Sequence, residues 1–85
     1  MLRKLFVLAE IQGQYTTYLM REPSNPFYGI SIDGVDYGLV PGVNDASIWL
    51  DVNDVETFLM MHEQAFSSIA GGVFEIKTIY KWFSE

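Results

Sequence analysis

The sequence predicts a single small α+β domain spanning residues 1–85, with a mainly antiparallel sheet of five to six strands and one helix packed on one face. Short runs rich in β-branched and aromatic residues recur along the chain between Gly-, Pro- and Asn-containing turns. Only residues 54–70 show the apolar spacing of a helix, and one more β-like run follows them. The expected order is therefore βββββαβ, and a sheet covered by one helix is the simplest way to bury both apolar faces.

The first two strands are expected at residues 2–11 and 15–20. Leu5 and Val7 begin an alternation of apolar side chains in the first run, which is typical of a strand with one buried face. The second run is rich in aromatic and β-branched residues. Gly13 lies between them and can adopt the positive φ of a tight turn.

The next two strands are expected at residues 27–32 and 35–40, on either side of Asp33-Gly34. An Asp-Gly pair between two β-like runs favours a type I′ hairpin, because that turn needs positive φ at both central residues. A further short strand is expected at residues 46–50.

The helix over residues 54–70 is expected to begin after an N-cap at Asn53, because Glu56 follows three residues later as in a capping box. The Gly-Gly pair at 71–72 ends it. The last strand is expected at residues 73–83.

The chain has no cysteine, so disulfides, thiolate metal sites and cysteine nucleophiles are excluded and a reducing, cytoplasmic location is expected. The apolar run near the start stops at Glu10 and is too short for a signal peptide, and no run reaches the roughly 20 residues of a membrane span. Hydrophobic residues make up 49% and aromatic residues 15% of the chain. A small core cannot bury all of them, which favours contact with a partner or with a second copy.

Acidic residues are concentrated in the middle of the chain. Residues 31–63 carry a charge of −7 with no Lys or Arg, whereas the remainder carries +1. One interpretation is a negative face that binds a basic protein partner. The alternative is a solvated surface, because turn and helix-cap chemistry accounts for most of these residues one by one. The candidate partner-binding residues are Asp33, Asp36, Asp51, Asp54, Glu56 and Glu63.

Metal, cofactor and nucleic-acid binding are not expected. Asp51 and Asn53 match the first positions of a calcium loop, but Val55 stands at the next ligand position and Glu56 where the loop needs Gly. Five basic residues at a net charge of −6 cannot readily supply the positive groove that nucleic acid requires.

His62, the single histidine, lies on the apolar stripe of the expected helix. It can be a general base with Glu63, Asp51 or Tyr37 nearby, a pH-sensitive contact, or a histidine at the edge of the core. The candidate pocket between helix and sheet includes His62, Tyr37 and Trp49. One histidine without a recognisable partner does not define a catalytic set, so we predict no catalytic residues.

Three hypotheses remain open. The first is a small non-enzymatic interaction module whose acidic face binds a basic protein partner, weakening with salt. The second is a self-assembling structural or subunit protein. It would form a homodimer or larger oligomer through aromatic side chains that the small core cannot bury, and this association would resist salt. The third is a small-molecule binder or enzyme with a pocket near His62.

Overall fold

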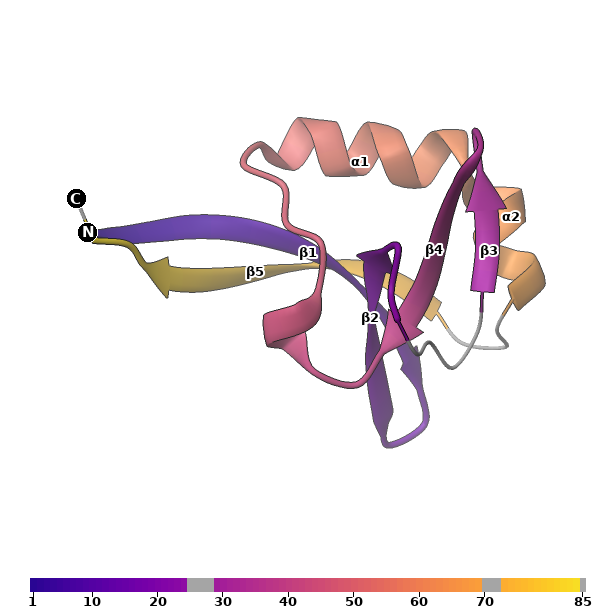
Figure 1. Cartoon of the computed structure of the whole chain (residues 1–85), viewed down its shortest axis with the longest axis horizontal. Helices are drawn as coiled ribbons and strands as arrows, with labels where there is room; N and C mark the ends of the chain where they lie inside the picture. The colour runs from indigo at the N-terminus through magenta and orange to yellow at the C-terminus, as the bar shows by residue number, and fades with distance from the viewer. Residues whose placement is uncertain (25–28, 70–72, 85) are drawn as a thin grey trace.

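The computed structural model describes residues 1–24, 29–69 and 73–84. A five-stranded antiparallel sheet in the order β3-β4-β2-β1-β5 carries the helical segment on one face, which confirms the predicted α+β fold (Figure 1). The elements are β1 (Leu2–Gln12), β2 (Tyr15–Arg21), β3 (Gly29–Ile32), β4 (Val35–Val40), the 3₁₀ turn η1 (Val43–Asp45), α1 (Val52–Met61), α2 (Glu63–Ile69) and β5 (Val73–Trp82).

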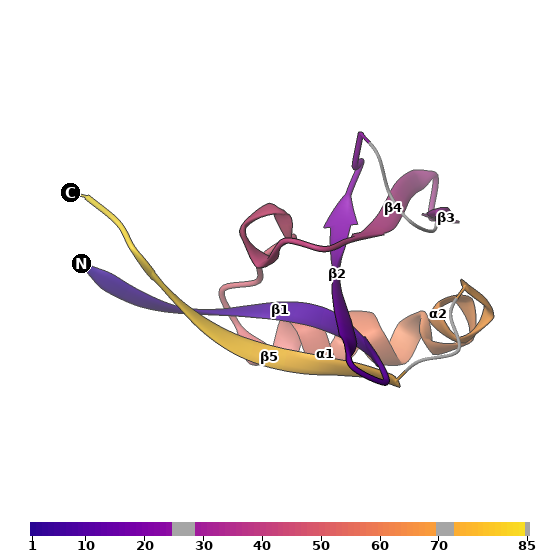
Figure 2. The same ribbon diagram turned by 90° about the horizontal axis from the view of Figure 1, so that it is seen from below.

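Strand β1 lies between β2 and β5, one position in from the edge of the sheet. It pairs with β2 through its last residues and with β5 along nearly its whole length. Because side chains alternate along a strand, Leu8 faces the helices while Leu5 and Val7 face the other way, and all three are fully buried. Figure 2 shows α1 on one side of β1 and the η1 segment on the other.

The main core lies between the sheet and the helices. Phe58 of α1 is its central ring, because its centroid lies 4.9–5.7 Å from the rings of Tyr37, Trp49, His62 and Phe66. These contacts join β4, the segment before α1, and both helices. The buried members of the cluster are Leu8, Leu19, Ile32, Leu39, Val55 and Phe66.

The predicted Asp-Gly hairpin is confirmed. Asp33 and Gly34 have φ values of 52° and 81°, and Ile32 pairs with Val35 across the turn. Positive φ at both central residues is the geometry of a type I′ turn, so this pair is explained by backbone conformation.

The predicted helix is wrong in its start and in its continuity. The N-cap is Asp51, whose carboxylate accepts a 2.8 Å hydrogen bond from the backbone N–H of Asn53. Asp and Asn cap equally well, so the sequence pattern did not distinguish the two. The helix also breaks at His62 (φ −120°, ψ 20°), and α2 begins at Glu63. The predicted end at residues 70–72 lies outside the described residues.

The expected strand at residues 46–50 is wrong in extent. Only Trp49 pairs, through reciprocal hydrogen bonds of 3.0 and 2.8 Å with Phe6 of β1. The preceding chain turns at η1 instead of running along the sheet. The sheet therefore has five strands, the lower of the two numbers predicted.

The outer ends of β1 and β5 form a two-stranded arm, residues 1–4 and 80–83, that extends beyond the other elements (Figure 1). The cross-strand register places Leu2 beside Trp82 and Arg3 beside Lys81. Leu2, Tyr80 and Trp82 are 58%, 62% and 76% exposed. The arm thus presents large apolar side chains to solvent.

Candidate functional site

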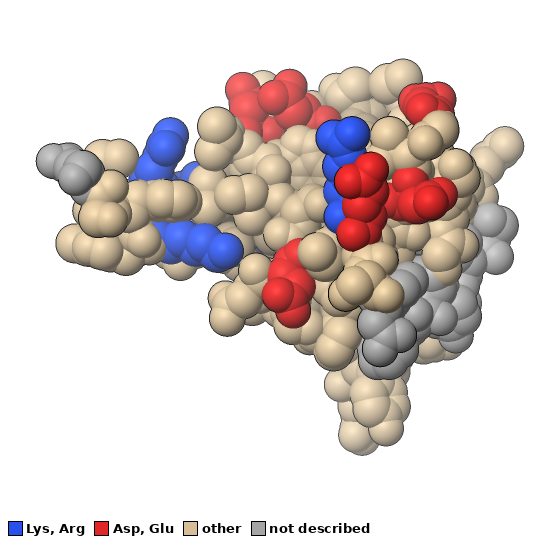
Figure 3. Space-filling model, viewed as in Figure 1, with Lys and Arg blue, Asp and Glu red and all other residues tan. Residues whose placement is uncertain are grey.

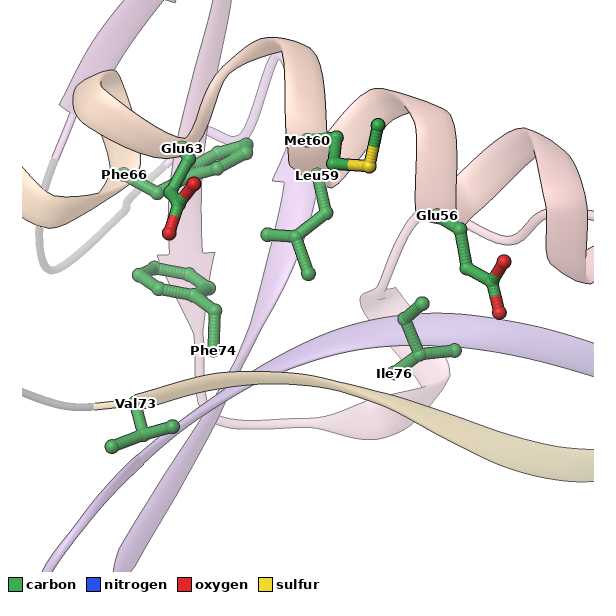
Figure 4. A pocket seen from close by; sticks show the side chains of 8 residues that line it. All are labelled: Glu56, Leu59, Met60, Glu63, Phe66, Val73, Phe74 and Ile76. Atoms are coloured by element: carbon green, nitrogen blue, oxygen red, sulfur yellow. The ribbon is translucent and has the colours of Figure 1, made fainter.

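A groove of about 550 Å³ lies between the helices and the first half of β5. Figure 4 shows side chains from the helices and from β5 converging on it. Most of the lining is apolar, with two carboxylates among it. The lining residues are Glu56, Leu59, Met60, Glu63, Phe66, Val73, Phe74 and Ile76.

The groove follows from two regular spacings. Helix positions four residues apart share one face, so Glu56 and Met60 lie on one side of α1. Glu63, at the start of α2, lines the same groove. On the strand, alternate residues share a face, so Phe74 and Ile76 both point toward the helices (Figure 4).

The floor of the groove is rigidly packed at one end. The rings of Phe66 and Phe74 lie 5.0 Å apart, and Phe66 is fully buried. Leu59 points into the space between helix and strand (Figure 4). An apolar floor of this kind can accept apolar side chains of a bound segment.

The rim of the groove is acidic. Glu56 and Glu63 both extend from the helices toward β5 (Figure 4), and Met60 between them is 76% exposed. Carboxylates beside an apolar floor match a ligand that combines apolar and cationic groups. Both glutamates belong to the acidic set identified from the sequence.

The other four residues of that set are not part of the groove lining. Asp51 caps α1 and Asp54 lies in its first turn. Asp33 lies in the β3–β4 turn, and Asp36 is an exposed residue of β4 that lines a shallower depression near Pro23. The structure therefore brings two of the six residues together at one site.

His62, Tyr37 and Trp49 do come close together, each in ring contact with Phe58. His62 Nε2 lies 3.9 Å from the Oδ2 atom of the exposed Asp33. This distance is longer than the hydrogen bond that orients a general base. The arrangement fits an aromatic cluster with the exposed Asp33 carboxylate at its margin.

The outer edge of β5 directs backbone groups away from the sheet. Met1 and Phe83 exchange backbone hydrogen bonds of 2.7 and 2.8 Å, whereas Phe6 bonds to Trp49 on the opposite edge of β1. Hydrogen-bonded pairs alternate along an antiparallel ladder. The backbone N–H and C=O groups of the odd-numbered residues of β5 therefore bond to β1, and those of the even-numbered residues point away from the sheet. Within the described part of the chain, β5 ends the sheet on that side. The sequence did not reveal this edge position.

Basic residues gather on the same two strands. Four of the five lie on β1 and β5, namely Arg3, Lys4, Lys77 and Lys81. On the face drawn in Figure 3 the arm carries Lys and Arg atoms, and the acidic atoms lie over the other elements.

Arg3 and Lys81 face each other across the ladder. Within residues 1–24, 29–69 and 73–84, neither has a carboxylate within 4.0 Å. The Arg3 guanidinium lies over the ring of Phe83, 5.7 Å from its centroid. Like charges opposite each other destabilise a sheet, so the pairing of Arg3 with Lys81 is unfavourable within the arm.

In the described ranges, no group of three or more His, Asp or Glu side chains is placed to hold a metal ion. The helices of that same part of the chain are too short to cross a membrane. Comparison with models of protein families, with curated proteins and with solved structures gives no match.

Proposed function

We propose that this protein is a small non-enzymatic interaction module that binds an extended basic segment of a protein partner in the groove between α1 and β5. The observation that carries the proposal is the apolar floor flanked by Glu56 and Glu63 beside the open edge of β5. A strand-like ligand can use all three features at once.

The ligand backbone adds to the edge of β5. Even residues such as Ile76 and Thr78 direct their N–H and C=O groups outward, where a further strand can pair. Main-chain hydrogen bonds then supply affinity, and side-chain pockets supply specificity.

Alternate side chains of the ligand enter the groove. Apolar ones pack against Leu59, Phe74 and Ile76, and cationic ones approach the rim carboxylates. The net charge of −6 also attracts a basic segment from a distance.

A labelled short peptide in which Lys and Leu alternate tests the proposal by fluorescence anisotropy. We expect this peptide to bind. The Glu56→Gln/Glu63→Gln variant should bind it at least about tenfold more weakly, because losing both carboxylate–Lys pairs should cost about 1.4 kcal/mol or more of binding free energy. A peptide in which Glu and Leu alternate should not bind.

The matched control is Asp36→Asn/Asp45→Asn, which changes net charge equally at exposed positions outside the groove. It should retain binding. Equal weakening by both double variants, or equal binding of both peptides, would show that the groove does not recognise a basic segment.

A cytoplasmic setting is part of the proposal. The chain contains no cysteine, which fits a reducing compartment because small secreted domains commonly rely on disulfides. Recovery of the protein in a secreted or membrane fraction of its source cells would contradict this location.

A further inference from the structure

We propose that a second copy of this chain occupies the site, with the two β5 strands pairing edge to edge, antiparallel and centred on Thr78. The inference rests on the proposed docking role of the groove and names the occupant. It predicts a closed homodimer in which the two sheets form one continuous sheet.

The hydrogen-bond parity of β5 permits this pairing. Even residues point their backbone groups outward, so a centre at Thr78 sets outward groups of one copy against outward groups of the other. Ile76 then lies opposite Tyr80 of the second copy, and Phe74 lies opposite its Trp82. A two-fold axis repeats each contact.

This register brings the arm of one copy to the groove of the other. Paired residues on adjacent strands share a face, so Tyr80 and Trp82 of the second copy lie on the face that carries Phe74 and Ile76. Both aromatic side chains are more than half exposed in the single chain. Aromatic anchors in apolar surroundings are typical of residues that dominate interface energy.

Charge selects this register over its neighbours. On the opposite face, a centre at Thr78 places Glu75 against Lys81 of the second copy, twice in the dimer. A centre at Lys77 sets two copies of Lys77 together, and a centre at Ile79 sets Lys77 against Lys81. Like charges in direct opposition are unfavourable.

A register centred on Ile76 also places Glu75 of one copy opposite Lys77 of the other. In that register, however, Tyr80 and Trp82 lie beyond the paired part of the two strands. The Thr78 register alone among these four combines opposite charges with contact between arm and groove. It also places a carboxylate beside Lys81, which faces Arg3 across the β1–β5 ladder.

Contact between two arms or between two grooves is disfavoured by the same charges. Two arms bring Arg3, Lys4 and Lys81 of both copies together, and two grooves oppose Glu56 and Glu63. Arm against groove is the arrangement in which opposite charges meet.

The test is the solution mass by light scattering over a range of protein concentrations. We expect a mass approaching twice the 9.7 kDa of the chain. Glu75→Lys and Lys81→Glu should each raise the dissociation constant about tenfold, because each turns two cross-strand pairs from opposite to like charge. The double variant Glu75→Lys/Lys81→Glu should recover wild-type association.

Asp45→Lys is the matched control, because it reverses an exposed charge on η1 away from β5. It should associate as the wild type does. Circular dichroism on each variant establishes that the substituted surface residues leave the fold intact.

A monomer at every concentration overturns the inference. If neither Glu75→Lys nor Lys81→Glu changes the dissociation constant of the dimer, β5 is not the interface. If the double variant does not recover wild-type association, the Thr78 register is wrong. The alternating Lys and Leu peptide separates this inference from the proposed function. It should dissociate the dimer, whereas peptide binding without a change in mass leaves the groove as a protein-binding site and removes the second copy as its occupant.

Discussion

At the residue scale, the helices contribute both buried and exposed side chains to the groove. Phe66 is 1% exposed, and its ring centroid lies 5.7 Å from that of Phe58 and 5.0 Å from that of Phe74. Met60, six residues earlier, also lines the groove but is mostly exposed. A substitution at Met60 can therefore change binding while the core stays intact.

Phe66→Ala should lower the free energy of unfolding by about 3–5 kcal/mol, because it removes a buried ring and leaves a cavity. Met60→Ala should change it by no more than about 0.5 kcal/mol, as is usual for exposed positions, but should weaken binding of the Lys and Leu peptide. Urea denaturation and fluorescence anisotropy measure the two effects. A large loss of stability in Met60→Ala would mean that the Met60 side chain belongs to the folding core.

Glu10 of β1 is a buried carboxylate, only 3% exposed. Its Oε1 atom accepts a hydrogen bond of 3.3 Å from the hydroxyl of Thr17, and no hydrogen-bond partner for Oε2 is found among the described residues. A buried polar atom without a hydrogen-bond partner opposes folding.

Glu10→Met should therefore raise the free energy of unfolding by about 1–2 kcal/mol, since it removes a buried polar atom that has no hydrogen-bond partner among the described residues. Glu22→Met, at an exposed position, is the control and should have little effect. Loss of stability in Glu10→Met would indicate that the carboxylate has a partner it needs.

At the element scale, local sequence patterns predicted the kinds of element better than their limits. Alternating apolar residues predicted β1 and β5, and Asp33-Gly34 predicted the β3–β4 hairpin, because both signals depend on neighbours in sequence. The start of α1 was misplaced because Asp51 and Asn53 are both good caps. The strand at 46–50 was overpredicted because its pairing depends on Phe6, far away in the chain.

The helix cap gives a direct test at this scale. Asp51→Ala should lower the free energy of unfolding by about 1 kcal/mol, because the N–H of Asn53 loses its acceptor. Asn53→Ala removes a side chain that makes no capping bond and should cost less than about 0.5 kcal/mol. Thermal denaturation compares the two, and the opposite order would assign the cap to Asn53.

At the scale of the whole molecule, the proposed function depends on contacts between elements that are far apart in the sequence. The sequence placed Glu56 and Glu63 in an acidic set, but the groove exists only because β5 lies beside α1. The arm likewise requires Leu2 to pair with Trp82 from the other end of the chain. Strand order is set by the packing of the whole sheet, so neither the edge position of β5 nor the pairing of Arg3 with Lys81 could be predicted.

Salt should separate the electrostatic and apolar contributions to binding. Raising the ionic strength from about 0.01 M to 1 M shortens the screening length from roughly 30 to 3 Å. We expect the affinity for the Lys and Leu peptide to fall, while association of two chains persists in part through Tyr80 and Trp82. Peptide binding that is unchanged by salt would exclude a role for the rim carboxylates.

The most direct measurement is amide hydrogen exchange on β5, with and without the Lys and Leu peptide, at a protein concentration where the chain is monomeric. We expect the outward amides of Ile76 and Thr78 to exchange more slowly when the peptide is bound, because they become hydrogen-bonded to it. The amides of Glu75 and Lys77, already directed at β1, should change little. Saturating peptide with no slowing at Ile76 or Thr78 would contradict binding along the edge of β5.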